Sequence, residues 1–146
     1  MKAIIQLFFV LITISGCNAQ KNLDNTIFEY IASTRGYYQK ILVHNQSIAV
    51  SIERNAKEMP VATKISKKDW LDIGTAFKKI NIENLPNLVA PSEERHTDKT
   101  AFASLKITQG KKEYQSAEFD NGNAPAEIAK LVNKITKLAQ KIQAKK

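Results

Sequence analysis

The chain has 146 residues, of which 43% are hydrophobic and 25% charged, and its formal net charge is +8. This length and composition are typical of one globular domain and disfavour a two-domain enzyme with an interdomain active site. A single cysteine excludes internal disulfides and multi-cysteine zinc or iron–sulfur sites.

The N-terminus has the order of residues found in a secretory signal. Lys2 is followed by a mostly apolar run over residues 4–14, and two small residues, Ser15 and Gly16, precede Cys17. The apolar run is much shorter than the roughly 20 residues that a membrane-spanning helix needs, and polar residues follow it. We therefore expect an export signal and no spanning helix here.

The four residues Ile14-Ser15-Gly16-Cys17 resemble a bacterial lipobox. The resemblance implies cleavage after a signal peptide of residues 1–16 and an N-acyl diacylglycerol group on Cys17, with no other cofactor expected. Several acyl chains anchor a protein firmly, since each buried methylene contributes about 0.8 kcal/mol. The alternative is an ordinary secretory protein with an accidental cysteine.

The residues after Cys17 are mostly polar, and Leu23 is the only sizeable apolar side chain before residue 27. We expect residues 17–26 to form a polar tether and residues 27–146 to form one domain. Asn18, and not aspartate, follows the cysteine. By resemblance to lipoprotein sorting signals, this favours the outer membrane, facing the periplasm.

The first part of the domain predicts three strands. Residues 27–31 and 37–43 are rich in β-branched and aromatic side chains, with a turn signal between them. After another turn, Ile48, Val50 and Ile52 alternate with small residues. This alternation predicts a half-buried strand with Ile48, Val50 and Ile52 facing the core.

An amphipathic helix is predicted to begin after Ser66. Asp69 lies three residues later, as in a capping box. Apolar residues then recur at helical spacing, and the helix is expected to end before Pro86. The members of this apolar face are Trp70, Ile73, Phe77 and Ile80. Residues 81–99 form a long connection with two prolines and a charged cluster.

The last part of the sequence predicts a hairpin and a second helix. Alternating residues 101–107 and the segment 113–119 flank a Gln-Gly-Lys turn, and residues 120–123 indicate a turn and helix cap. Pro125 occupies a position tolerated in a first helical turn. The helix that follows has an apolar face of Ile128, Leu131, Val132, Ile135, Leu138, Ala139 and Ile142.

This order of three strands, a helix, two strands and a helix predicts an α+β fold. We expect an antiparallel sheet of about five strands covered by two amphipathic helices in a two-layer sandwich. The layout, with Gly110-Lys111 in a turn and Ala124-Pro125 before the last helix, resembles small bacterial domains of unknown function. This resemblance implies no particular activity.

The densest polar cluster lies in the long connection. Carboxylates, an imidazole and a guanidinium occur there within seven residues, which suits a partner-recognition loop, a metal or acid–base site, or a solvated surface. We predict no catalytic or metal site. The candidate partner-binding residues are Glu93, Glu94, Arg95, His96 and Asp98.

One face of the predicted last helix carries a stripe of lysines. It suits contact with an anionic membrane or envelope polymer, or an ordinary solvated face. Export makes nucleic acid a poor partner. The stripe consists of Lys130, Lys134, Lys137 and Lys141.

These features predict a lipid-anchored envelope protein that binds an envelope protein or an anionic envelope polymer and is not an enzyme. Two alternatives remain open. One is a small hydrolase or metal-dependent enzyme that uses the loop from Glu93 to Asp98. The other is a periplasmic inhibitor that inserts the connection 84–99 into a partner's cleft.

Overall fold

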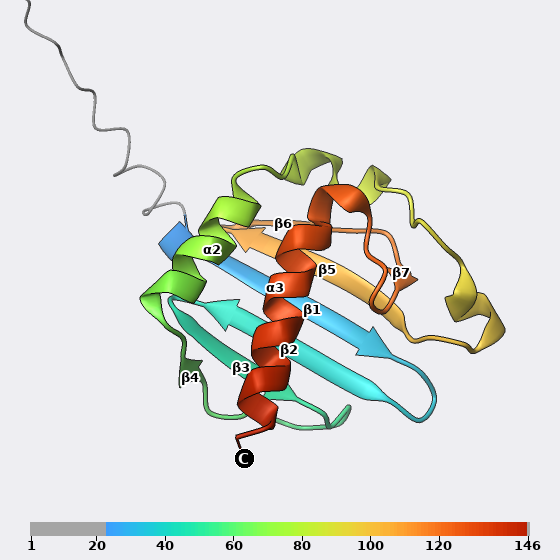
Figure 1. Ribbon diagram of the computed structural model, residues 1–146, viewed down its shortest axis with the longest axis horizontal. Helices are drawn as coiled ribbons and strands as arrows, with labels where there is room; N and C mark the ends of the chain where they lie inside the picture. The colour runs from blue at the N-terminus through green and yellow to red at the C-terminus, as the bar shows by residue number, and fades with distance from the viewer. Residues whose placement is uncertain (1–22, 146) are drawn as a thin grey trace, which may run out of the picture.

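The computed structural model describes residues 23–145 and has two layers (Figure 1). Helices α2 and α3 lie on one face of an antiparallel sheet. The elements, in chain order, are β1 Thr26–Ser33, β2 Tyr38–His44, β3 Ser47–Ser51, β4 Thr63–Lys64, α2 Lys67–Phe77, the 3-10 turns η1 Ile82–Asn87 and η2 Glu94–Thr97, β5 Phe102–Gln109, β6 Lys112–Gln115, β7 Phe119–Asp120 and α3 Ala126–Gln143.

The sheet order is β4-β3-β2-β1-β5-β6, and β7 pairs with the start of β5. The first and second strand groups therefore meet at β1 and β5, where Phe28 pairs with Ile107. The predicted α+β two-layer sandwich is confirmed. The sheet contains two strands more than the five expected, β4 and β7, each only two residues long.

The core lies between the sheet and the helices because both elements place apolar residues on one side. Along β1, Phe28, Tyr30 and Ala32 are fully buried, whereas the residues between them face the uncovered side. On that side Glu29 forms ion pairs with Lys40 at 2.8 Å and with Lys106 at 3.3 Å. One face of the sheet is therefore apolar and covered, and the other is mixed and open.

Local signals explain where several elements begin and turn. Ser66 caps α2, since the Asp69 backbone N–H donates to Ser66 Oγ at 3.0 Å. The tight turn between β2 and β3 consists of Asn45 and Gln46, with φ of 46° and 56°. Two left-handed residues in succession give the turn twist that a two-residue hairpin requires. The helix cap and the turn after His44 are where the sequence predicts them.

The third strand is shorter than expected, which corrects the prediction for Ile52. β3 ends at Ser51, and the Ile52 side chain is 66% exposed. Ser51 Oγ accepts from the Glu53 N–H and donates to the Glu53 carbonyl, both at 3.3 Å. Such side-chain bonds compete with the strand ladder and turn the chain away before Ile52 can reach the core.

The segment 113–119 is also not one strand. Ser116 Oγ accepts the Leu105 N–H at 3.0 Å, in place of a backbone carbonyl. This bond interrupts the ladder after Gln115, and pairing resumes only at Phe119, opposite Ala103. The interruption has a consequence for the site, because it brings Asp120 into the interior.

The folded domain also includes residues that the sequence assigns to the tether. Leu23 is buried in the core and Thr26 begins β1. The Leu23 side chain lies against Gly74 of α2, so closely that a methyl group on residue 74 would come 2.8 Å from Leu23 Cδ2. Leu23 fills the space that Gly74 leaves, so residues 23–26 belong to the folded domain and not to the predicted tether.

Candidate functional site

The lipobox and Cys17 lie outside the described residues, so the lipid anchor stays a prediction. Among residues 23–145, no helix is long and apolar enough to cross a membrane. In the same range, no group of three or more His, Cys, Asp or Glu side chains is placed to hold a metal ion.

The charged loop predicted to contact a partner is held to the domain by Arg95. The Arg95 side chain is buried, and its Nη1 forms an ion pair with Asp120 Oδ1 at 3.1 Å and donates to the Ser92 carbonyl at 2.6 Å. This corrects the expectation that Arg95 is a surface contact. The guanidinium fixes the loop and is not presented to a partner.

Asp120 is the centre of this network, and sequence reasoning treated it only as part of a turn. Its carboxylate accepts hydrogen bonds from the Ser92 hydroxyl, the Glu94 N–H at 2.8 Å and the Arg95 N–H at 3.0 Å. Burial alone would raise the pKa of Asp120. The bonds from Ser92 and Arg95 outweigh this effect and hold the pKa well below its usual value.

The other four predicted loop residues have a different environment. The side chains of Glu93, Glu94, His96 and Asp98 are exposed, and the His96 ring packs edge-on against Phe102 with centroids 5.5 Å apart. The structure therefore places them on one anchored loop. Their contact with a partner stays a prediction.

The Asp120 network predicts a defined loss of stability in acid. A carboxyl group whose pKa is lower in the folded state stabilises the fold above its unfolded pKa, about 4, and this contribution falls as pH drops below that value. In urea unfolding, Asp120→Asn should be less stable than the parent near neutral pH. The difference between the two proteins should shrink toward about pH 2.

Asp98→Asn is a suitable control, because Asp98 is an exposed carboxylate in the same loop with a left-handed φ of 58° that asparagine tolerates. Its unfolding curve should follow that of the parent protein at each pH. A pH-independent difference between Asp120→Asn and the parent would contradict the role given to the Asp120 charge.

The lysine stripe on α3 is only partly free. Lys134 forms ion pairs with Asp69 at 3.0 Å and Asp72 at 2.9 Å, which join α3 to α2, and these bonds raise the pKa of Lys134. Lys130 and Lys137 are exposed on the same helix, as is Lys141 of the predicted stripe. Three of the four predicted lysines are therefore available to an anionic surface.

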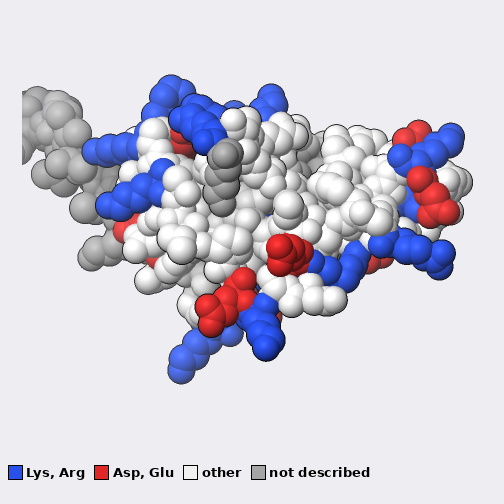
Figure 2. All heavy atoms as spheres, turned by 90° about the horizontal axis from the view of Figure 1, so that it is seen from below, with Lys and Arg blue, Asp and Glu red and all other residues white. Residues whose placement is uncertain are grey.

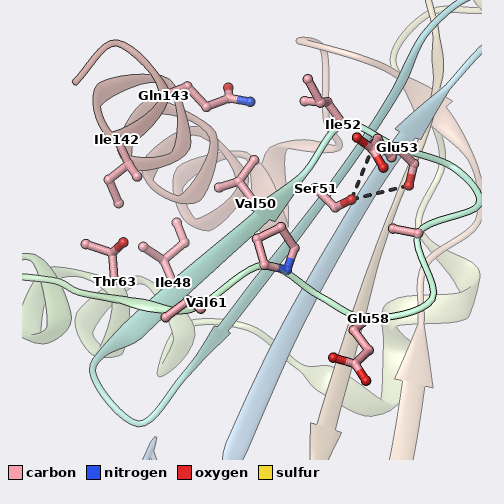
Figure 3. Close-up of a pocket in the computed structure, with 12 residues that line it drawn as sticks. Ile48, Val50, Ser51, Ile52, Glu53, Glu58, Val61, Thr63, Ile142 and Gln143 are labelled. Atoms are coloured by element: carbon pink, nitrogen blue, oxygen red, sulfur yellow. Dashed lines mark hydrogen bonds between the residues drawn. The ribbon is translucent and has the colours of Figure 1, made fainter. Parts of the chain in front are cut away.

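An apolar groove lies at the β3 edge of the sheet (Figure 3). It encloses about 430 Å³ between β3, the connection 52–62 and the end of α3. Ile48 from β3 and Ile142 from α3 point toward each other across it. The other apolar residues that line the groove are Val50, Ile52, Ala56, Pro60 and Val61.

Two properties make this groove a candidate binding site. Ile52 and Val61 are 66% and 92% exposed, which is unusual for two large apolar side chains that line one groove. In addition, β4 pairs with β3 only at Ser47 and Ile48. Within the part of the chain that the structure describes, no strand lies along the outer edge of β3 beyond Ile48.

The charges around the groove differ at its two ends. Glu53 and Glu58 belong to its lining, and a neighbouring hollow of about 350 Å³ shares Ile142 with it and is bordered by Lys64 and Lys141. Figure 2, a view toward this edge of the molecule, shows uncharged atoms over much of the middle and both acidic and basic side chains below them. The groove is therefore apolar with a charged margin.

Sequence reasoning missed this groove because it placed Ile52 in the core and assigned no role to the connection after it. The signal that could have found it is Met59-Pro60-Val61-Ala62, an apolar run at the end of a mostly polar connection, which follows an Ile that the Ser51 turn excludes from the strand. Compared with known proteins, the chain matches no protein-family model and no curated sequence.

Proposed function

We propose that the chain is a lipid-anchored, non-enzymatic binding module of the bacterial cell envelope. Cys17 carries the acyl chains, in the outer membrane facing the periplasm, and the groove beside β3 binds an apolar segment of an envelope protein. The observation that carries the proposed binding function is the exposed apolar lining of the groove, above all Val61 and Ile52.

The physical argument is that this lining gains free energy when a partner covers it. Each Å² of apolar surface removed from water contributes about 25 cal/mol. The uncovered edge of β3 between Ala49 and Ser51 also offers backbone groups to an extended segment, as in strand addition. A lipid anchor raises the local concentration of the module, so a modest affinity is sufficient for binding.

The anchor is tested by replacing Cys17 with serine. The parent protein should fractionate with membranes, with a mass increased by the acyl groups, because several chains hold it in the bilayer. Cys17→Ser should move to the soluble fraction or stay unprocessed and without lipid. A Cys17→Ser protein that is processed and still bound to membranes like the parent would contradict the anchor.

The groove is tested with a photo-crosslinking amino acid at residue 61 in intact cells. Val89 provides a matched control, since it is also an exposed valine, 83% against 92%, and lies in the connection between η1 and η2. We expect a discrete crosslinked protein from position 61 and none from position 89. The adduct should be lost when Ile52→Asp is added, because an aspartate there is charged and hydrated.

Residues 52, 61 and 89 are all exposed, so substitutions there should leave the unfolding free energy nearly unchanged. Equal adducts at the two positions, or an adduct at position 61 that survives Ile52→Asp, would contradict the groove as the binding site. Membrane fractionation of these variants should match that of the parent, which separates the groove from the anchor.

A further inference from the structure

The positive charge of the domain is concentrated in its helix layer. Residues 63–80 and 126–145, which contain β4 and both helices, carry ten lysines and three acidic residues. The remaining described residues carry nine basic and eleven acidic side chains. The helix layer is therefore strongly basic, and the rest of the described domain is slightly acidic.

The lysines of this layer point away from the core. On α3, Lys130, Lys137 and Lys141 are exposed, whereas the opposite side of the helix is buried against the sheet. Both helices lie on the same face of the sheet (Figure 1), and basic side chains dominate the upper left border of Figure 2. Of the three acidic residues, Asp69 and Asp72 are already paired with Lys134.

The chain enters the domain at this same layer. Leu23 lies against Gly74 of α2, and Cys17 precedes Leu23 by six residues. Six residues span at most about 20 Å even when fully extended. A lipid anchor on Cys17 would therefore keep α2 within about 20 Å of the membrane surface.

We propose that the helix layer rests on the anionic head groups of the membrane that holds the anchor. This inference depends on the proposed lipid anchor on Cys17. Surface lysines are attracted to anionic lipids over a distance of about one Debye length, roughly 8 Å at physiological ionic strength. In this orientation the open face of the sheet, with Glu29 at its centre, faces away from the membrane.

The test uses the full lipidated protein in vesicles of phosphatidylcholine, with and without phosphatidylglycerol. Once Cys17 is acylated, an introduced cysteine is the only thiol. A fluorophore is placed at Asn133→Cys on α3 or at Gln115→Cys on β6, since both residues are exposed. Spin-labelled head groups quench a fluorophore that lies close to the membrane surface.

We expect quenching at residue 133 and little at residue 115 in vesicles with phosphatidylglycerol. Quenching at residue 133 should be lost in pure phosphatidylcholine and at about 1 M salt, where the Debye length is near 3 Å. The triple variant Lys130→Gln, Lys137→Gln and Lys141→Gln should lose it as well. The matched control is a second triple variant, Lys99→Gln, Lys111→Gln and Lys112→Gln, which removes the same amount of charge outside the helix layer. This control should keep the quenching at residue 133.

Equal quenching at the two positions, or quenching at residue 133 that does not depend on anionic lipid, would overturn the orientation. So would equal effects of the two triple variants. Failure of the anchor gives a different result, because the parent protein without an introduced cysteine would then take up the fluorophore at Cys17. The orientation and the anchor are thus tested by separate readouts.

Discussion

The Arg95→Met variant is expected to lose about 3 kcal/mol of unfolding free energy, since removing one partner of a buried ion pair leaves the Asp120 charge buried without its cationic partner. Arg95 and Asp120 are both almost fully buried, and Arg95 Nη1 bonds both Asp120 and the Ser92 carbonyl. Methionine keeps much of the apolar volume but provides neither bond.

The measurement is urea unfolding at neutral pH, with Arg35→Met as the control. Arg35 is exposed in the turn between β1 and β2, so its replacement should change stability by less than about 0.5 kcal/mol. A loss in Arg95→Met no larger than that of the control would show that Arg95 does not hold the loop 92–98 in place.

Phe28→Ala is expected to have a still larger effect, about 4 kcal/mol. Phe28 of β1 is fully buried, and its ring meets the Phe77 ring of α2 edge-on, with centroids 5.1 Å apart. Its removal creates a cavity between the sheet and α2. The backbone of β1 is paired on both sides, so the cavity cannot collapse easily.

Ile31→Ala provides a control on the same strand. Ile31 faces the open side of the sheet and is only partly buried, so its truncation should cost about 1 kcal/mol. Both variants can be compared by thermal or urea unfolding. Similar losses in the two proteins would contradict a sheet that is covered on one face alone.

The sequence was sufficient to predict the elements whose signal is local. The spacing of Ile128, Leu131 and Ile135 predicts α3, and the alternation around Leu105 predicts β5, because the periods of helix and strand are properties of the backbone. The class of fold follows from the order of these elements. The pairing of β1 with β5 does not, since it joins segments that lie far apart in the chain.

For the candidate site residues, too, local signals could be predicted from the sequence and contacts between distant residues could not. The lysine stripe of α3 follows from helical spacing, but the engagement of Lys134 depends on Asp69 and Asp72 of another helix. Arg95 looks like a surface residue in the sequence, and only the interruption of the ladder after Gln115 brings Asp120 beside it. Contacts between distant residues thus decide which polar side chains are available.

The central position of β1 has a consequence for how the domain folds. Its neighbour β5 comes late in the chain, and the Tyr30 hydroxyl donates to Asn121 Oδ1 across 91 residues. Such non-local contacts require the closure of long loops, so folding should be slow compared with that of a helical bundle of equal size. Until residues 102–109 arrive, one edge of β1 stays unpaired, and exposed strand edges promote association between chains. The domain therefore gains its protection from aggregation only when nearly the whole chain is present.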